Sequence, residues 1–113
     1  MLRQISIAIP AKDYTDEILK CKIKDMHTAE AVCMWSSEKD LDIYMQDTYN
    51  ATHPDIYKPG DKVEITKKTI ENMRPLMNHH VLEVRRPGNM ETALEAIEKK
   101  LDEGYRVFYI SAW

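Results

Sequence analysis

Apolar residues recur along this chain with two alternating spacings, either every second residue or every third to fourth residue. The first spacing occurs near the N-terminus, where a half-buried strand at residues 2–9 is predicted by Ile5, Ile7 and Ile9. The second spacing is clearest near the C-terminus, in the helical stripe of Met90, Leu94, Ile97 and Leu101. Strand and helix periods in one short chain predict an α+β fold.

Two further strands are expected in the first third of the chain. Residues 17–24 keep the period of two, because Leu19, Cys21 and Ile23 alternate with lysines, and residues 31–35 are apolar throughout. A turn centred near His27 would join these strands as a hairpin, in which Cys21 faces Cys33. The outward face of this hairpin would carry Lys20, Lys22 and Lys24, which keep an exposed sheet face soluble.

Beyond residue 37 the predicted elements alternate between helix and strand. They are a helix at 38–49, a long loop at 50–61, a strand at 62–66, a short helix capped by Thr66, extended structure at 81–86, a helix from Asn89 to Gly104, and a strand at 105–112. Pro75 is expected to end or kink the short helix. The predicted order is βββαβαβαβ in a single domain over residues 1–113, with a mixed or antiparallel sheet and helices mainly on one face.

Composition narrows the class of protein. With 43% apolar and 31% charged residues, the chain is expected to fold around a core rather than remain disordered. No secretory leader and no apolar run of the ~20 residues that span a bilayer is present, so a cytoplasmic protein without membrane contact is expected. In that compartment Cys21 and Cys33 are predicted to be reduced, buried thiols.

The residue types that perform catalysis do not form a motif in this sequence. Adjacent His79 and His80 would point to opposite faces of a strand, and no pair of residues has the spacing of metal ligands, so neither a metal nor a cofactor is expected. No phosphate-binding glycine loop and no nucleophile elbow occurs. These observations favour a non-enzymatic role.

One region combines acids with tyrosines, which are common in protein interfaces. Its residues are Asp40, Asp42, Tyr44, Asp47, Tyr49, Asp55 and Tyr57. Tyrosine supplies contact area and a hydrogen bond, and the carboxylates would steer a basic partner, so a surface that binds another protein is the leading hypothesis. The alternative is that Tyr44 packs in the core and the acids are merely solvated.

A second hypothesis is a small-ligand or nucleotide-binding protein with an anion pocket between sheet and helices. The residues that would hold the anion are Arg74, His79, Arg85 and Arg86. Direct nucleic-acid binding ranks last, because the net charge is −3 and no dense basic stretch occurs. Self-association is left open.

Two segments resemble parts of small uncharacterised bacteriophage-encoded accessory proteins. The segment 91–111 contains the letters EGYRVFYIS after an amphipathic helix, and the segment 57–63 enters a strand through Pro59 and Gly60. This resemblance implies an accessory protein that binds and modulates a host factor, of the kind that blocks a defence system. It transfers no catalytic residue.

Overall fold

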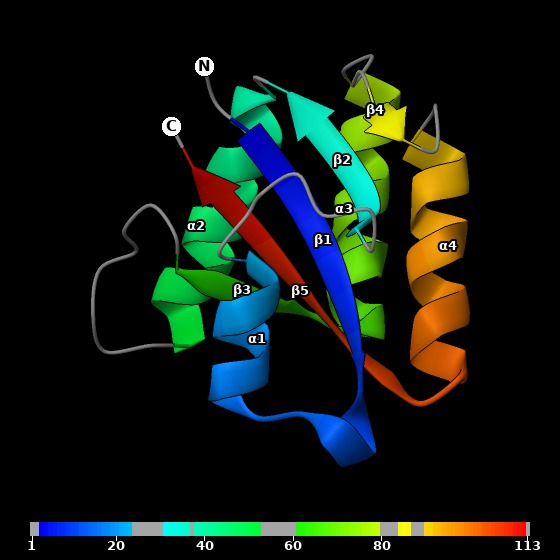
Figure 1. The fold of residues 1–113 in the computed structure, drawn as a ribbon. Coiled ribbons are helices and arrows are strands. Elements are labelled where there is room, and N and C mark those ends of the chain that lie inside the picture. The colour runs from blue at the N-terminus through cyan, green and yellow to red at the C-terminus, as the bar shows by residue number, and fades with distance from the viewer. Residues whose placement is uncertain are drawn as a thin grey trace.

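The computed structural model describes residues 3–23, 31–36, 38–52, 61–79, 84–86 and 90–112 (Figure 1). The strands in these ranges are β1 (Arg3–Pro10), β2 (Ala31–Ser36), β3 (Lys62–Ile65), β4 (Val84–Arg86) and β5 (Tyr105–Ala112). The helices are α1 (Asp16–Ile23), α2 (Lys39–Thr52), α3 (Lys67–His79) and α4 (Met90–Asp102), and a 3-10 turn at Ala11–Asp13 precedes α1. The chain is therefore an α+β protein, as its two apolar spacings predict.

The strands form one five-stranded sheet in the order β3-β5-β1-β2-β4, and each neighbouring pair is antiparallel. The prediction left mixed and antiparallel sheets open, and the structure contains the antiparallel one. β1 lies in the centre and pairs with β5 along its whole length, from Arg3 opposite Ala112 to Pro10 opposite Tyr105. The first and last strands of the chain are thus neighbours, and β5 separates β1 from β3.

Helices cover both faces of the sheet, but mainly one, as expected. Figure 1 shows α1 in front of the sheet and α2, α3 and α4 behind it. The larger core lies under these three helices and contains Cys33, Trp35, Leu41, Met45, Val63, Ile65, Ile70, Met73, Ala93, Leu94, Ile97, Val107 and Tyr109. The smaller core lies under α1 and contains Ile5, Ile7, Ile9, Leu19, Ala31, Phe108 and Ile110.

The expected strand at residues 17–24 is wrong, because residues 16–23 form α1. The helix begins after Thr15, whose Oγ1 accepts a hydrogen bond from the Ile18 backbone amide at 3.1 Å, and two acids in the first turn favour this start. A period of two over only a few residues does not exclude a helix, and the cap decided between the two structures. The element order is therefore βαβαβαβαβ, not βββαβαβαβ.

The expected hairpin and its cysteine pairing are also wrong. β2 pairs with β1 instead, with Ser6 opposite Cys33 and a bulge between Ser6 and Ile7. Cys21 is exposed on α1, whereas Cys33 is buried in β2 and donates a hydrogen bond to the Ala93 carbonyl at 3.5 Å. Neither of these two cysteines is part of a disulfide bond. The predicted turn at His27 lies outside the described residues.

The later elements follow the prediction more closely. α2 and β3 lie where expected, although α2 extends to Thr52. α3 continues past the exposed Pro75 to His79, because Ile70 and Met73, one turn earlier, bury the helix in the core. Only Val84–Arg86 of the predicted 81–86 segment is described, and the Asn89 cap lies outside the described residues. Gly104 ends the α4 segment with φ of 89°, a conformation that glycine adopts without strain.

Candidate functional site

The acid-and-tyrosine region lies on α2, and the helix divides its residues between two faces. Asp40 and Asp47 are exposed, and Ile43 lies between them on the same side of the helix. Ile43 has 55% of its surface exposed and is the large apolar side chain most open to solvent in the described part of the chain. The outer face of α2 therefore carries one apolar residue flanked by two carboxylates.

Asp42 is buried, unlike the other two acids. Only 5% of its surface is exposed, and Tyr109 Oη donates a hydrogen bond of 2.8 Å to its Oδ1. Gln46 Nε2 donates another bond of 2.8 Å to Oδ2, so both carboxylate oxygens have partners. Asp42 also lies in the first turn of α2, where the partial positive charge of the helix start favours an anion. This acid holds the helix in place and cannot contact a partner directly.

Gln4 extends the same buried network to the start of α2. Its Nε2 donates to Tyr109 Oη and to the Glu38 carbonyl, each at 2.9 Å, and its Oε1 accepts from the Glu38 amide at 2.8 Å. A side chain of the central strand thus hydrogen-bonds both backbone groups of Glu38, just before the helix, and the Glu38 carbonyl also accepts from the Asp42 amide at 3.1 Å. The position of α2 on the sheet is set by polar contacts as well as by apolar packing.

The two tyrosines of α2 are half-buried. Tyr44 Oη donates a hydrogen bond of 3.4 Å to the Thr69 carbonyl of α3, and Tyr49 packs against the larger core. Tyr44 thus packs against the core and is also partly accessible, so the structure is compatible with both the packing and the interface interpretations. Asp55 and Tyr57 lie outside the described residues.

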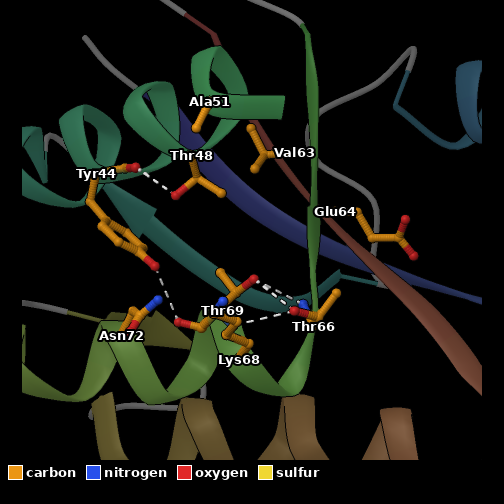
Figure 2. A pocket seen from close by; sticks show the side chains of 9 residues that line it. All are labelled: Tyr44, Thr48, Ala51, Val63, Glu64, Thr66, Lys68, Thr69 and Asn72. Atoms are coloured by element: carbon orange, nitrogen blue, oxygen red, sulfur yellow. Dashed lines mark hydrogen bonds between the residues drawn. The ribbon is translucent and has the colours of Figure 1, made fainter. Parts of the chain in front are cut away.

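A pocket of about 560 Å³ lies between α2, β3 and the start of α3. It is lined by Tyr44, Thr48, Ala51, Val63, Glu64, Thr66, Lys68, Thr69 and Asn72. Figure 2 shows Val63 pointing from β3 toward α2, whereas the Glu64 side chain points to the other side of the strand. The wall is made largely of carbon atoms, with hydroxyl groups between them.

The hydroxyls at the start of α3 are engaged with one another. The Thr66 amide donates to Thr69 Oγ1 at 3.1 Å, and the Thr69 amide donates to Thr66 Oγ1 at 3.3 Å. The two hydroxyls are themselves 3.1 Å apart, and Thr48 Oγ1 donates to the Tyr44 carbonyl at 3.0 Å (Figure 2). This reciprocal cap engages the amides of Thr66 and Thr69 at the pocket wall.

The residues expected to hold an anion do not line this pocket. Arg74 forms an ion pair with Glu98 of α4, which places its guanidinium on the α4 side of α3. His79 is the last residue of α3, and Arg85 and Arg86 belong to β4, at the sheet edge opposite β3. The pocket lies beside β3 and between helices, but its lining contains none of the four residues expected to hold an anion.

A group of charged side chains around Tyr14 links α1 to the β3 edge. Lys62 Nζ donates to Asp16 Oδ1 at 2.6 Å, Tyr14 Oη donates to the same oxygen at 2.7 Å, and Arg106 makes two hydrogen bonds to Glu64. The hydrogen bond from Lys62 lowers the pKa of Asp16, and the hydrogen bond to Glu64 raises the pKa of Arg106. These charges satisfy one another, so we assign them a structural role.

The described residues lack two other kinds of site. Within those ranges no group of three or more histidine, cysteine, aspartate or glutamate side chains could hold a metal ion. In the same part of the chain no helix is long and apolar enough to cross a membrane.

Comparison with known proteins finds no relative. No protein-family model matches the chain, and no curated protein or solved structure shows significant similarity to it. The site must therefore be interpreted from its own geometry.

Sequence reasoning missed two parts of this site. Ile43 falls off the stripe of Leu41, Tyr44, Met45 and Thr48, and an isoleucine on the polar side of a helix was a usable signal. The α3 wall of the pocket, by contrast, left no local signal, because Thr66, Lys68 and Thr69 form a pocket only when α2 packs beside them.

Proposed function

We propose that this chain is a non-enzymatic protein-binding module whose contact surface is the outer face of α2. The observation that carries the proposal is the exposure of Ile43, at 55%, between the carboxylates of Asp40 and Asp47. An apolar residue with charged residues beside it matches the apolar centre and polar rim of many protein interfaces. The expected partner surface is apolar at its centre and basic at its rim.

Burial energy, electrostatic attraction and a low loss of conformational entropy all favour binding at this surface. Covering the exposed part of Ile43 would contribute about 1–2 kcal/mol to binding. The two acids would raise the association rate of a basic partner more than its final affinity. The buried bonds of Gln4, Tyr109 and Asp42 hold α2 on the sheet, so little conformational entropy is lost on binding. Asp42 thus supports the surface without belonging to it.

The test is affinity capture with a double variant, Ile43→Asp with Asp47→Lys. We expect this variant to weaken binding of the specific partner by at least about tenfold, because it removes the apolar anchor and reverses a charge. The control is Glu95→Lys, an exposed acid of α4. Quantitative mass spectrometry of captured proteins measures the difference, and thermal melting verifies folding. Equal capture by both variants would show that α2 is not the contact surface.

We further propose that binding modulates or inhibits the partner, the role implied by the resemblance to bacteriophage accessory proteins. A small domain with one ordered contact face can cover a basic site on another protein without supplying chemistry. The test is the activity of the captured partner with and without added domain. The two cysteines, neither of which is in a disulfide, support a cytoplasmic site of action.

Small-ligand binding is the second candidate, and the pocket of about 560 Å³ is the observation that favours it. A thermal-shift screen with nucleotides, sugars and amines tests this candidate. A ligand present at 100 times its dissociation constant would stabilise the protein by about 2.7 kcal/mol. Stabilisation by a free metabolite, lost in the pocket-filling variant Ala51→Leu, would favour this function over protein binding.

A further inference from the structure

The pocket and the outer face of α2 form one continuous surface. Asp47 lies three residues after Tyr44 and four residues before Ala51, and both of these line the pocket. Residues at these separations are neighbours on a helix surface, about 5–6 Å apart at Cβ. Asp47 therefore lies at the α2 rim of the pocket. A partner seated over Ile43 would also reach the pocket mouth.

Two backbone amides and one hydroxyl at the pocket are already hydrogen-bonded within the protein. The amides of Thr66 and Thr69 at the start of α3 are used by the reciprocal cap, so these two N–H groups are not open to an anion. Tyr44 Oη gives its proton to the Thr69 carbonyl and keeps its lone pairs. Lys68 and Asn72 add donors to the lining, so hydrogen bonding alone does not select the ligand and the charge at the rim decides.

The charges at the two sides of the pocket differ. Asp47 is exposed and makes no hydrogen bond or ion pair within the described part of the chain, so its carboxylate is open to a cation. Lys68 is exposed on the α3 side and is the one opposing charge in the lining. A cationic group would therefore be held toward α2. The accessible part of the Tyr44 ring offers a second attraction to a cation there.

We propose that this pocket receives a lysine or arginine side chain of the protein partner, with its methylene stem against Val63, Ala51 and Tyr44 and its charged group at Asp47. Long basic side chains bury an apolar stem and keep the charge at a rim, which matches a carbon-rich pocket beside a carboxylate. This inference rests on the proposed function, because it assigns the partner's chemistry at the same surface.

The test is an NMR titration of the full chain with the capped tripeptide acetyl-Gly-Arg-Gly-amide. The matched neutral probe replaces arginine by citrulline, which has the same shape without the charge. We expect saturable shifts at Thr48, Ala51 and Val63 with the arginine peptide, and binding weaker by about two- to fivefold with the citrulline peptide. Equal binding of the two peptides, or no saturable shift up to the solubility limit, would overturn the proposal.

Variants that change the charge on either side of the pocket give a second test, in which peptide binding should change in opposite directions. Asp47→Asn should weaken the arginine peptide by about two- to fivefold, and Lys68→Gln should strengthen it by a similar or smaller factor. Glu95→Gln on α4 is the control and should change nothing. A pocket built for anions would instead bind acetyl-Gly-Glu-Gly-amide, and Lys68→Gln would weaken that binding. That result would also refute the inference.

The inference and the proposed function can fail separately. Ile43 does not line the pocket, so Ile43→Asp should weaken partner capture while leaving the arginine peptide bound. If the peptide binds but Ile43→Asp captures the partner normally, the proposed function is wrong and only the pocket chemistry stands. If capture depends on Ile43 but the peptide does not bind, the pocket inference alone is refuted.

Discussion

The hydroxyl of Tyr109 hydrogen-bonds two buried polar side chains that are far apart in the sequence, Gln4 of β1 and Asp42 of α2. It accepts a hydrogen bond from Gln4 at 2.9 Å and donates one to Asp42 at 2.8 Å. Tyr109 is fully buried on β5, and Gln4 and Asp42 are buried too, so these groups cannot exchange their hydrogen bonds for bonds to water. Such groups are costly to leave unpaired, and this network therefore specifies one seating of α2 on the sheet.

Replacing Tyr109 by phenylalanine should destabilise the protein by about 1–3 kcal/mol, because the Asp42 carboxylate and the Gln4 amide each lose a buried partner. The ring and its packing against Trp35 remain. Urea denaturation measures the change in unfolding free energy. The control is Tyr105→Phe in the same strand, which should alter stability by less than about 0.5 kcal/mol. Equal effects of the two substitutions would contradict the role assigned to the network.

At the scale of elements, α1 shows how a short helix is attached to a distant strand. Its first residue, Asp16, binds Lys62 of β3 at 2.6 Å, while Tyr14 stacks on Phe108 with ring centroids 5.0 Å apart. The Arg106 guanidinium lies 4.2 Å from the centre of the Tyr14 ring. The smaller core and this cluster together hold α1 on the face opposite the other helices.

The Asp16 contact should make stability depend on pH in the acidic range. The hydrogen bond from Lys62 lowers the folded-state pKa of Asp16 below its ordinary value of 3.8. The unfolded chain therefore binds this proton more readily, so the contribution is complete above the unfolded pKa and is lost as the pH falls through the folded pKa. Asp16→Asn should remove that part of the pH dependence.

The measurement is the urea midpoint of the wild type and of Asp16→Asn at a series of pH values below neutrality. The two curves should approach each other as the pH falls below 3.8, the ordinary carboxyl pKa. Asp13→Asn, in the turn before α1, is the matched control and should run parallel to the wild type. Added salt should shrink the difference, since the Asp16 side chain is 63% exposed. A constant gap between wild type and Asp16→Asn at every pH would rule out the ionic contact.

At the scale of the whole molecule, the sheet is held together by the pairing of the first and last strands. β5 makes the longest register with β1 and also carries β3 on its other side. Its residues Val107, Phe108, Tyr109 and Ile110 supply both cores and are at most 1% exposed. Neither core can form before the end of the chain has joined the sheet, which predicts cooperative folding.

Deleting residues 105–113 should therefore unfold the protein. Loss of four buried side chains alone removes about 6–12 kcal/mol of favourable burial, which is comparable to the total stability of a small domain. Circular dichroism and NMR dispersion measure the result. Adding a synthetic peptide of residues 105–113 should restore the native spectrum by completing the sheet. A truncated chain that stays folded would show that β5 is peripheral.

Local sequence patterns predicted most of the helices and strands, but not which strands pair with each other. The alternation of Ile5, Ile7 and Ile9 and the helix that ends at Gly104 were predictable, because each pattern is longer than one period and has a clear boundary signal. The pattern at residues 17–24 was too short to separate helix from strand, so α1 was missed. The mistaken pairing of Cys33 with Cys21 followed from that error, since Cys33 lies opposite Ser6 in the structure.

The sequence by itself determined that this chain is an α+β protein with an acidic, tyrosine-bearing helix at about residues 38–49. Only the tertiary structure decided which of that helix's acids are available, since Asp42 is buried by a tyrosine 67 residues away and Asp47 is not. The same packing of α2 beside β3 and α3 created the pocket. Periodicity indicates which face of a helix is apolar. Whether a particular polar group can be buried depends on which distant side chain can form a hydrogen bond with it.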